Sequence, residues 1–286
     1  MIRGPTSAAA AVSALAKRLA AAGIETAQLE AEVLVAAACG QRREWVLAHP
    51  GAPVSPAERR RAARLADRRA AREPLAYVLG EAEFYSLALR VDATTIVPRP
   101  ETEILAEAAL ERAGARGARI AVDVGTGCGA LAVVMARHGD GLRLVASDVS
   151  KEALRLAREN CRRHGVEGRV MLVCADLLGG VRLRADCIVA NLPYVASDAF
   201  DGLAPEVRDF EPRAALDGGD DGLRVIRRFA AQVFDHLSEG AFAAVEVGAG
   251  QAERVAKLLA SGGLGSIEVV ADYAGIERVV IGWREG

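Results

Sequence analysis

The chain has 286 residues, of which 51% are hydrophobic and 26% are charged, a composition typical of a globular protein and not of a disordered one. Its length accommodates one large domain and one small domain. The five cysteines form no C-x-x-C pair, which argues against a disulfide framework and against a zinc site. No apolar run reaches the roughly 18 residues of a membrane span. We therefore expect a cytoplasmic protein without a metal and without a membrane partner.

The net charge of −2 hides an asymmetry along the chain. Residues 1–75 contain 12 Lys and Arg against 7 Asp and Glu, whereas the remainder contains 24 against 31. Seven arginines of the first part gather in one segment: Arg59, Arg60, Arg61, Arg64, Arg68, Arg69 and Arg72. Such a cluster fits an acidic or nucleic-acid partner, but a solvated helix face is the simpler interpretation.

The chain up to residue 80 shows apolar residues at helical spacing, for example Leu15 and Leu19, and Ser55-Pro56 is typical of a helix start. We predict a small helical bundle over residues 1–80. The stretch from Phe84 to Val97 alternates and is rich in β-forming residues, so residues 81–97 are predicted to form a β-hairpin linker. A third region follows over residues 98–286.

Strand-like and helical segments alternate through this third region. The predicted strands are Ala118 to Val124, Leu142 to Ser147, Arg169 to Cys174, Ala185 to Ala190, Ala241 to Val247, Ser266 to Ala271 and Glu277 to Gly282. The predicted helices between them are Ala130 to His138, Lys151 to His164, Gly222 to Leu237 and Gln251 to Leu259. This pattern predicts an α/β fold, with a mostly parallel, Rossmann-like seven-stranded sheet covered on both faces. Only residues 272–276 separate the last two strands, so these should pair antiparallel.

A glycine-rich loop follows the first strand of this region, as Gly125-Thr126-Gly127-Cys128-Gly129. Glycines let a backbone turn sharply and approach a ligand, because no Cβ stands in the way. The spacing G-x-G-x-G departs from the G-x-G-x-x-G of dinucleotide-binding folds. A tight turn with no ligand is the alternative interpretation. We interpret Cys128 as a small filler of the loop and not as a nucleophile, since no base is near it in the sequence.

Acidic residues follow the next two strands, and the carboxyl ends of parallel strands border the ligand crevice. Asp148 is predicted to accept hydrogen bonds from both hydroxyls of a ribose, although it could instead be the N-cap of the helix beginning at Lys151. Asp176 is predicted to accept from an adenine amino group, and Leu177 to cover the adenine ring. Together the three loops resemble the nucleoside pocket of class I S-adenosylmethionine-dependent methyltransferases.

The reacting site is predicted in Asn191-Leu192-Pro193-Tyr194, which follows the strand Ala185 to Ala190. An amide nitrogen is a poor nucleophile because its lone pair is delocalised into the carbonyl. A sulfonium methyl group is already activated, so the nitrogen needs two acceptors for its N–H groups and no strong base. Asn191 Oδ1 and the backbone carbonyl of Leu192 or Pro193 can be these acceptors. Tyr194 would stack on the flat amide; an Asx-type turn with a half-buried tyrosine is the alternative.

Asn191-Leu192-Pro193-Tyr194 is similar to the N-P-P-Y signature of amino-methyltransferases, which act on glutamine amides and on exocyclic nitrogens of nucleic-acid bases. Further segments narrow the resemblance: E-P-L-A-Y-V-L-G at 73–80, V-P-R-P-E-T-E at 97–103, E-P-R-A-A-L-D-G-G at 211–219 and E-V-G-A-G-Q at 246–251. From about residue 70 to the C-terminus the chain resembles the bacterial release factor glutamine methyltransferases, the HemK/PrmC family. The helical region before it has the size and position that this family expects.

The resemblance implies S-adenosylmethionine as the cofactor and peptide chain release factors as the partner, methylated on N5 of the glutamine in their Gly-Gly-Gln loop. It implies that residues 125–129 hold the methionine part of the cofactor and that Asp148 holds its ribose. Asn191, Pro193 and Tyr194 become the catalytic residues, with Leu192 as a further substrate contact and Asn191 also touching the cofactor. Residues 1–80 become a substrate-binding domain, and we expect a monomer that requires no nucleic acid.

Two features qualify this transfer of roles. Leu192 stands where the family has its first proline, but that position acts through its backbone carbonyl, so the chemistry should survive. Arg99 and Glu101 precede the helix that leads into the first strand, and they can be explained as a helix start with acidic residues in its first turn. The resemblance implies that they also contact the substrate at the mouth of the site.

Two other functions compete with protein methylation. A DNA or RNA amino-methyltransferase would also use an N-x-P-Y loop, but it should present positive charge around its active site. Residues 76–286 instead carry a net charge of −7. A nucleoside-binding module without turnover is the third possibility, and the presence of both Asn191 and Tyr194 argues against it.

Overall fold

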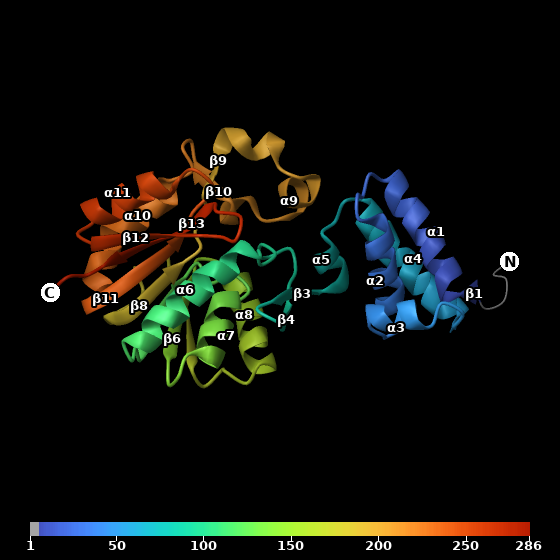
Figure 1. Cartoon of the computed structure of the whole chain (residues 1–286), viewed down its shortest axis with the longest axis horizontal. Helices are drawn as coiled ribbons and strands as arrows, with labels where there is room; N and C mark the ends of the chain where they lie inside the picture. Colours follow the sequence, from blue (N-terminus) through green and yellow to red (C-terminus); the bar gives the residue numbers. More distant parts are fainter. Residues whose placement is uncertain (1–5) are drawn as a thin grey trace. The chain divides into compact units, whose positions relative to one another are not determined.

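The computed structural model describes residues 6–286, which form two compact units. A helical unit contains residues 6–80 together with residues 204–210. An α/β unit contains residues 81–203 and 211–286. Figure 1 shows both units.

The helical unit is built from five helices of the first 80 residues and one short helix from residues 204–210. The helices are α1 (Ala8–Ala21), α2 (Ala27–Ala38), α3 (Arg43–Ala48), α4 (Pro56–Ala70), α5 (Leu75–Leu79) and α9 (Pro205–Phe210). Two short strands, β1 (Thr6–Ser7) and β2 (Pro53–Val54), pair antiparallel. The predicted start of α4 is confirmed: Ser55 and Glu58 form a reciprocal capping box, and Pro56 is the first helical residue. Buried Leu19, Leu34 and Val35 lie at the centre of the core.

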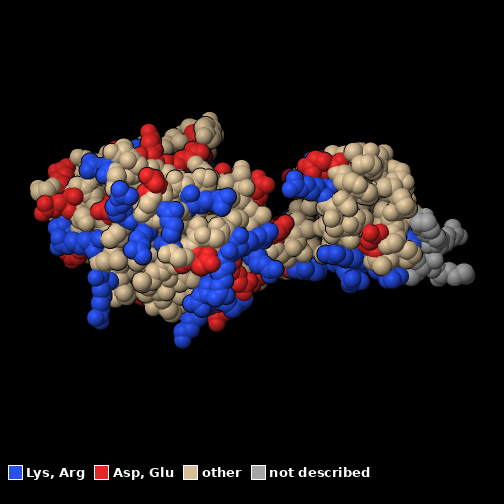
Figure 2. Space-filling model, turned by 90° about the horizontal axis from the view of Figure 1, so that it is seen from below, with Lys and Arg blue, Asp and Glu red and all other residues tan. Residues whose placement is uncertain are grey.

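The arginine cluster of this unit is only partly a solvated face. Arg69 is buried, and its guanidinium lies 2.5 Å from Glu30 Oε2 and 2.9 Å from Glu206 Oε1. Arg72 donates to the Gly23 carbonyl and to Glu206, and Arg68 pairs with Glu73. The solvated-face interpretation is therefore wrong for Arg69 and Arg72, which pair with Glu206 of α9, whereas Arg68 is exposed as expected. The arginines at 60, 61 and 64 are exposed, and Figure 2 shows basic side chains along one edge of this unit.

The α/β unit opens with a hairpin of β3 (Glu81–Phe84) and β4 (Leu87–Arg90). Its two turn residues, Tyr85 and Ser86, both have positive φ (52° and 57°), as a type I′ turn requires. The predicted hairpin from Phe84 to Val97 is therefore wrong in its extent. Asn-Gly or Asp-Gly is the usual signal for such a turn, and Tyr-Ser gives no such signal. Residues 91–100 form irregular chain instead.

The central sheet has seven strands in the order β12-β13-β11-β8-β5-β6-β7. Their bounds are β5 (Ile120–Val124), β6 (Arg143–Asp148), β7 (Val170–Cys174), β8 (Ala185–Ala190), β11 (Leu237–Glu246), β12 (Gly265–Ala271) and β13 (Glu277–Trp283). Only β13 is antiparallel to its neighbours within this sheet. The predicted seven-stranded α/β sheet with one reversed strand is confirmed.

Helices cover both faces of the sheet (Figure 1). On one face lie α6 (Glu101–Ala115), α7 (Ala130–His138) and α8 (Lys151–Arg163), and on the other α10 (Arg224–Val233) and α11 (Ala252–Ser261). The predicted helix from Gly222 to Leu237 ends earlier, at Val233, and a 3₁₀ turn (Phe234–His236) leads directly into β11. Between β8 and α10 the chain forms a parallel pair, β9 (Val195–Ala196) with β10 (Asp217–Gly219), and two 3₁₀ turns, Ser197–Gly202 and Arg213–Ala215.

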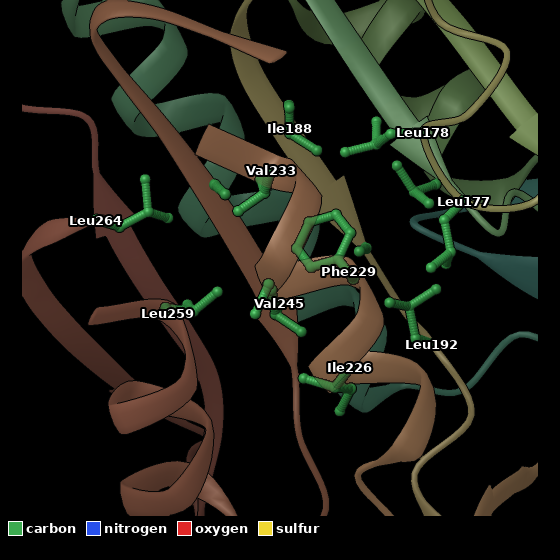
Figure 3. Close-up of a cluster of buried hydrophobic side chains, with 14 of the residues drawn as sticks. Leu177, Leu178, Ile188, Leu192, Ile226, Phe229, Val233, Val245, Leu259 and Leu264 are labelled. Atoms are coloured by element: carbon green, nitrogen blue, oxygen red, sulfur yellow. The ribbon is translucent and has the colours of Figure 1, made fainter. Parts of the chain in front are cut away.

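The core between the sheet and α10 reaches the loop that follows β8. Phe229 of α10 is fully buried among Ile188, Val245 and Ile226 (Figure 3). Leu192 belongs to the same cluster and is 3% exposed. The chain crosses to opposite sides of β5 when it forms β6 and β8, so the sheet has its topological switch point between β5 and β8. Open α/β sheets bind ligands at that point.

Candidate active site

A cavity of about 540 Å³ lies at the carboxyl ends of β5, β6, β7 and β8. This volume is in the range of small-molecule sites. Predicted site residues that line it are Gly125, Gly127, Asp148, Asp176, Leu177, Asn191, Leu192 and Pro193. Residues from four separate loops thus meet at one place, as the positions after successive strands predicted.

The glycine loop lies directly against the loop that follows β8. Gly125 has φ of +74°, and a Cβ there would come within 3.3 Å of Leu192 Cδ2 and 3.5 Å of the Asn191 carbonyl oxygen. Gly129 has a different role, because a Cβ on it would lie 3.0 Å from Ala157 Cβ in α8. Gly129 therefore permits the close packing of α7 on α8, whereas Gly125 brings two cavity-lining loops together.

Thr126 and Cys128 of this loop do not line the cavity. The Thr126 hydroxyl donates to Asp123 Oδ2 at 2.6 Å, and the Ala132 backbone N–H donates to the same oxygen at 3.1 Å. Burial raises the pKa of Asp123 to about 7. Cys128 is 3% exposed, and burial raises the pKa of its thiol to about 12, so the thiol is neutral. Both side chains are thus buried within the protein and do not face the cavity.

Asp148 combines a place in the cavity with support of the glycine loop. Its Oδ2 accepts from the Gly127 backbone N–H at 2.9 Å, and its Oδ1 accepts from the Ser150 N–H at 2.8 Å. The N-cap of α8 is Ser150, whose hydroxyl accepts from Ala153 N–H, so the N-cap interpretation of Asp148 is wrong. Each carboxylate oxygen can accept a second hydrogen bond, which leaves room for two hydroxyls of a ribose.

Asp176 and Leu177 follow β7 at the far side of the cavity. Asp176 Oδ2 lies 2.5 Å from Arg228 Nη2, and both residues line the cavity. Leu177 has a positive φ of 53°, and its carbonyl accepts from the buried Ser147 hydroxyl at 3.1 Å. The Leu177 side chain thus presents an apolar surface beside a paired carboxylate, an arrangement that suits a flat ring with an exocyclic amino group.

Asn191 is oriented by a hydrogen bond from its amide nitrogen. Asn191 Nδ2 donates to the Thr102 hydroxyl oxygen at 3.0 Å, which leaves Asn191 Oδ1 as the acceptor end of the side chain. The side chain contacts α6 through Thr102. An Asx turn at Asn191 would need a backbone N–H on residue 193, and residue 193 is a proline without one, so this alternative does not apply to the loop. Strand β8 ends at Ala190, so the carbonyls of Leu192 and Pro193 lie beyond its ladder.

Tyr194 is half-buried and is fixed at two points. Its hydroxyl donates to Glu246 Oε1 at 3.3 Å, and its backbone carbonyl accepts from Gln251 Nε2 at 2.9 Å. Burial is the first cause that raises the pKa of the Tyr194 hydroxyl, and the Glu246 carboxylate raises it further. The tyrosine is therefore a neutral, positioned ring directly after the three lining residues Asn191 to Pro193, but it does not itself line the cavity.

Arg99 and Glu101 do not line the cavity. Arg99 Nη2 lies 2.6 Å from Glu211 Oε2, and burial raises the pKa of Glu211 although the Arg99 charge opposes this. Helix α6 begins at Glu101, which lies 3.9 Å from Arg278. The Arg99 charge also acts on Tyr194, where it opposes the rise of the hydroxyl pKa. Arg99 thus forms an ion pair with the segment Glu211-Pro212-Arg213, and its charge is close enough to Tyr194 to affect the pKa of the tyrosine hydroxyl.

Several residues that line the cavity were not identified as site residues from the sequence. Thr94, Thr95 and Ile96 come from the irregular chain after β4, which was predicted as a hairpin. Arg228 belongs to α10, a helix that was predicted from the spacing of its apolar residues alone, and this spacing gives no role to a polar residue. Pro212 belongs to a segment quoted for its family resemblance, which gave it no role.

Among residues 6–286, no helix has both the length and the hydrophobicity that a membrane span requires. The described residues also contain no group of three or more His, Cys, Asp or Glu side chains placed to hold a metal ion.

Three features define a class I S-adenosylmethionine-dependent methyltransferase: the sheet with the reversed strand β13, the glycine loop at the switch point, and Asp148 at the end of β6. A methyltransferase from Pyrococcus furiosus has the same fold, with a TM-score of 0.54 at 20% identity over 71% of this chain and 91% of that chain. Family models match at residues 10–80, described as the PrmC N-terminal domain, and at residues 100–207, described as the methyltransferase small domain.

Full-length relatives narrow the class to a family. The release factor glutamine methyltransferase of Moorella thermoacetica is 40% identical over 94% of this chain and 95% of its own length. The enzyme of the same name from Geobacter sulfurreducens is 40% identical over 92% of each chain. The chain belongs to the release factor glutamine methyltransferase family, as its motifs predicted.

Proposed function

We propose that this chain transfers the methyl group of S-adenosylmethionine to the side-chain amide nitrogen of the glutamine in the Gly-Gly-Gln loop of a peptide chain release factor. One observation carries the choice of an amide as the substrate. Asn191 is tied through Nδ2 to Thr102, so its Oδ1 remains to accept from a donor at the cavity. The relatives that bear the name of this activity support the same substrate.

The residues that line the cavity offer a suitable contact for each part of the cofactor. The absent Cβ of Gly127, whose position has no atom nearer than Thr95 Cβ at 4.0 Å, leaves space beside the loop for the methionine part. Asp148 would hold the ribose hydroxyls, and Asp176 with Leu177 would hold the adenine. The cofactor supplies a methyl group on a positively charged sulfur, which is a good leaving group.

The chain's own residues then hold the substrate nitrogen. Its two N–H groups would be accepted by Asn191 Oδ1 and by the carbonyl of Leu192 or Pro193, while the Tyr194 ring covers the flat amide and excludes water. Positioning of this kind supplies on the order of 7–11 kcal/mol of a barrier. The methylated nitrogen would give up one of its two protons to solvent as the product leaves, so the product has one N–H in place of two. It therefore loses one of these hydrogen bonds and is held less tightly than the substrate.

We further infer that the chain works as a monomer in the cytoplasm and takes the release factor as its protein partner without a nucleic-acid component. Residues 76–286 carry a net charge of −7, which does not favour a phosphate backbone. On the face of the α/β unit drawn in Figure 2, acidic and basic side chains are mixed. Sedimentation of the purified chain, alone and with a release factor, checks the monomer.

A labelled-methyl assay tests the proposed substrate. The enzyme should transfer one methyl group to a release factor and none to the same factor with Gln→Ala in the Gly-Gly-Gln loop. Asn191→Ala should lower kcat by on the order of 10² or more and leave cofactor affinity nearly unchanged, because it removes an acceptor that aligns the amide. Equal labelling of the two factors, or efficient labelling of DNA alone, would overturn the assignment.

A further inference from the structure

A buried carboxylate lies behind the loop that holds the substrate amide. Glu246 is the last residue of β11 and is 1% exposed. The Tyr194 hydroxyl donates to its Oε1, whereas Oε2 has no hydrogen-bond partner within residues 6–286. Thr102, which is 4% exposed on α6, is another hydroxyl that acts on this carboxylate: hydrogen bonding from its side chain opposes the rise of the Glu246 pKa. The same Thr102 accepts from Asn191 Nδ2.

We infer that Glu246 is a positioning residue that sets the orientation of both Asn191 and Tyr194 for methyl transfer. The inference rests on the proposed function, since it assigns a role in that same site. Glu246 itself does not line the cavity, so it acts through its two neighbours.

The orientation of Asn191 depends on the single proton of the Thr102 hydroxyl. A hydroxyl has one donor and two acceptor positions. When Thr102 gives its proton to the Glu246 carboxylate, its oxygen can only accept from Asn191. The Asn191 amide then has its nitrogen toward Thr102 and its Oδ1 toward the substrate. Since the two ends of an amide have nearly the same shape, this hydrogen-bond polarity decides which end the substrate meets.

Loss of the negative charge would release that proton. A protonated Glu246 no longer requires the Thr102 hydrogen, so the hydroxyl can donate to Asn191 Oδ1 instead. The amide would then turn over and present its NH₂ group to the NH₂ group of the substrate, where two donors face each other. The Tyr194 hydroxyl would lose its charged acceptor at the same time.

The surroundings of Glu246 bring this change into the neutral pH range. Burial raises the pKa of Glu246 to about 7, while hydrogen bonds from Thr102 and Tyr194 oppose the rise. Glu101 of α6 also raises this pKa, and Arg278 of β13 lowers it. Arg278 is itself paired with Asp272 at 2.8 Å. The active, ionised form of Glu246 should therefore increase between about pH 6 and pH 8.

The same shift predicts the sign of the effect on stability. The folded-state pKa of Glu246 lies above the unfolded value of about 4.5, so the folded state binds the proton more tightly. The stability that this group contributes at low pH is lost as the pH rises from the unfolded pKa through about 7. A neutral Glu246→Gln variant should thus be at least as stable as the wild type at about pH 8, although it is less active.

Steady-state kinetics on a release factor test the inference with four variants. Glu246→Gln and Thr102→Val should lower kcat by on the order of tenfold to a hundredfold with an unchanged KM for S-adenosylmethionine, because the amide is misaligned. Thr102→Ser keeps the hydroxyl and should restore kcat to within about threefold of the wild type. The control Glu268→Gln removes a carboxylate of β12 that pairs with Arg112, and it should leave kcat unchanged.

The pH profile and the melting temperature separate positioning from a structural role. Wild-type kcat should rise with an apparent pKa near 7, and this limb should be absent from Glu246→Gln, whose Tm at about pH 8 should equal or exceed that of the wild type. An unchanged limb in Glu246→Gln, or equal kcat of Thr102→Val and Thr102→Ser, would overturn the inference. A wild-type enzyme that fails to label any release factor would overturn the proposed function instead.

Discussion

Asp148 combines a structural role with its proposed role in ribose binding. Its carboxylate anchors Gly127 N–H and Ser150 N–H, and it also lines the cavity. Asp148→Ala should weaken S-adenosylmethionine binding by about 1.5–3 kcal/mol, because two ribose hydroxyls lose a charged acceptor. Calorimetric titration measures this. Asp148→Asn, which retains one carbonyl oxygen, should give an intermediate affinity, and unchanged affinity in Asp148→Ala would remove Asp148 from the site.

Leu192 contributes more than a backbone carbonyl. Because the family has proline at this position and the position acts through its backbone carbonyl, the sequence alone leads us to expect that Leu192→Pro is nearly neutral. The structure buries the leucine side chain in the cluster around Phe229 and against the position of Gly125 (Figure 3). We now expect Leu192→Pro to lower the free energy of unfolding by about 1–2 kcal/mol through lost packing.

Chemical denaturation of two variants measures this contribution. Leu192→Ala removes more of the side chain and should cost about 2–5 kcal/mol. If both variants unfold like the wild type, the leucine acts through its carbonyl alone.

The sequence could reveal only those site residues that follow a strand end. Gly125, Asp148, Asp176 and Asn191 each come within two residues of a predicted strand, so their convergence followed from parallel-sheet topology. Thr102 reaches Asn191 across 89 residues, and Glu246 reaches Tyr194 across 52. Both lie in segments that the family resemblance marked. Their roles depend on hydrogen-bond polarity in the packed fold, which no spacing encodes.

At the scale of elements, Asn160 joins the hairpin, α8 and the glycine loop. Its Oδ1 accepts from Arg90 N–H at 2.7 Å, and its Nδ2 donates to the Arg90 and Cys128 carbonyls at 2.9 and 2.8 Å. Asn160 is 0% exposed, and Asn160→Ala removes the partner of these three backbone groups, of which the Cys128 carbonyl is buried and the two of Arg90 are partly buried. The free energy of unfolding should fall by about 2–4 kcal/mol in a urea titration. The neighbouring exposed change Glu159→Ala should stay within about 0.5 kcal/mol of the wild type, and a similar value for Asn160→Ala would contradict this role.

The order of strands and helices was readable because buried parallel strands and amphipathic helices have distinct apolar periods. The segment Ala185 to Ala190 is bounded in the structure as predicted. The hairpin was predicted at the wrong position because its Tyr85-Ser86 turn contains neither glycine nor asparagine, the residues that usually mark such a turn. The segment 204–210 was also unpredicted as part of the helical unit, since its placement depends on the contacts of Glu206.

At the scale of the whole molecule, the helical unit depends on a charge from a distant part of the chain. Arg69 is buried between Glu30 and Glu206, and Glu206 also pairs with Arg72. Glu206→Ala should destabilise the protein by about 2–4 kcal/mol, because it removes an acceptor from the buried Arg69 guanidinium and from the half-buried Arg72 guanidinium. Thermal unfolding monitored by circular dichroism measures this.

Asp67→Asn is the matched control for Glu206→Ala. It breaks the exposed ion pair between Arg18 and Asp67 and should cost at most about 1 kcal/mol. Equal effects of the two changes would show that the buried network adds nothing beyond a surface pair.

The return of residues 204–210 to the helical unit also limits how relatives can exchange parts. A chimera that takes only residues 6–80 from another family member would combine foreign partners of Arg69 and Arg72 with the native Glu206. Recombination near residue 80 is therefore compatible with a stable product only if the short segment between Leu203 and Glu211 is inherited from the same parent. The residues at position 206 and at positions 69 and 72 should therefore covary among members of the family.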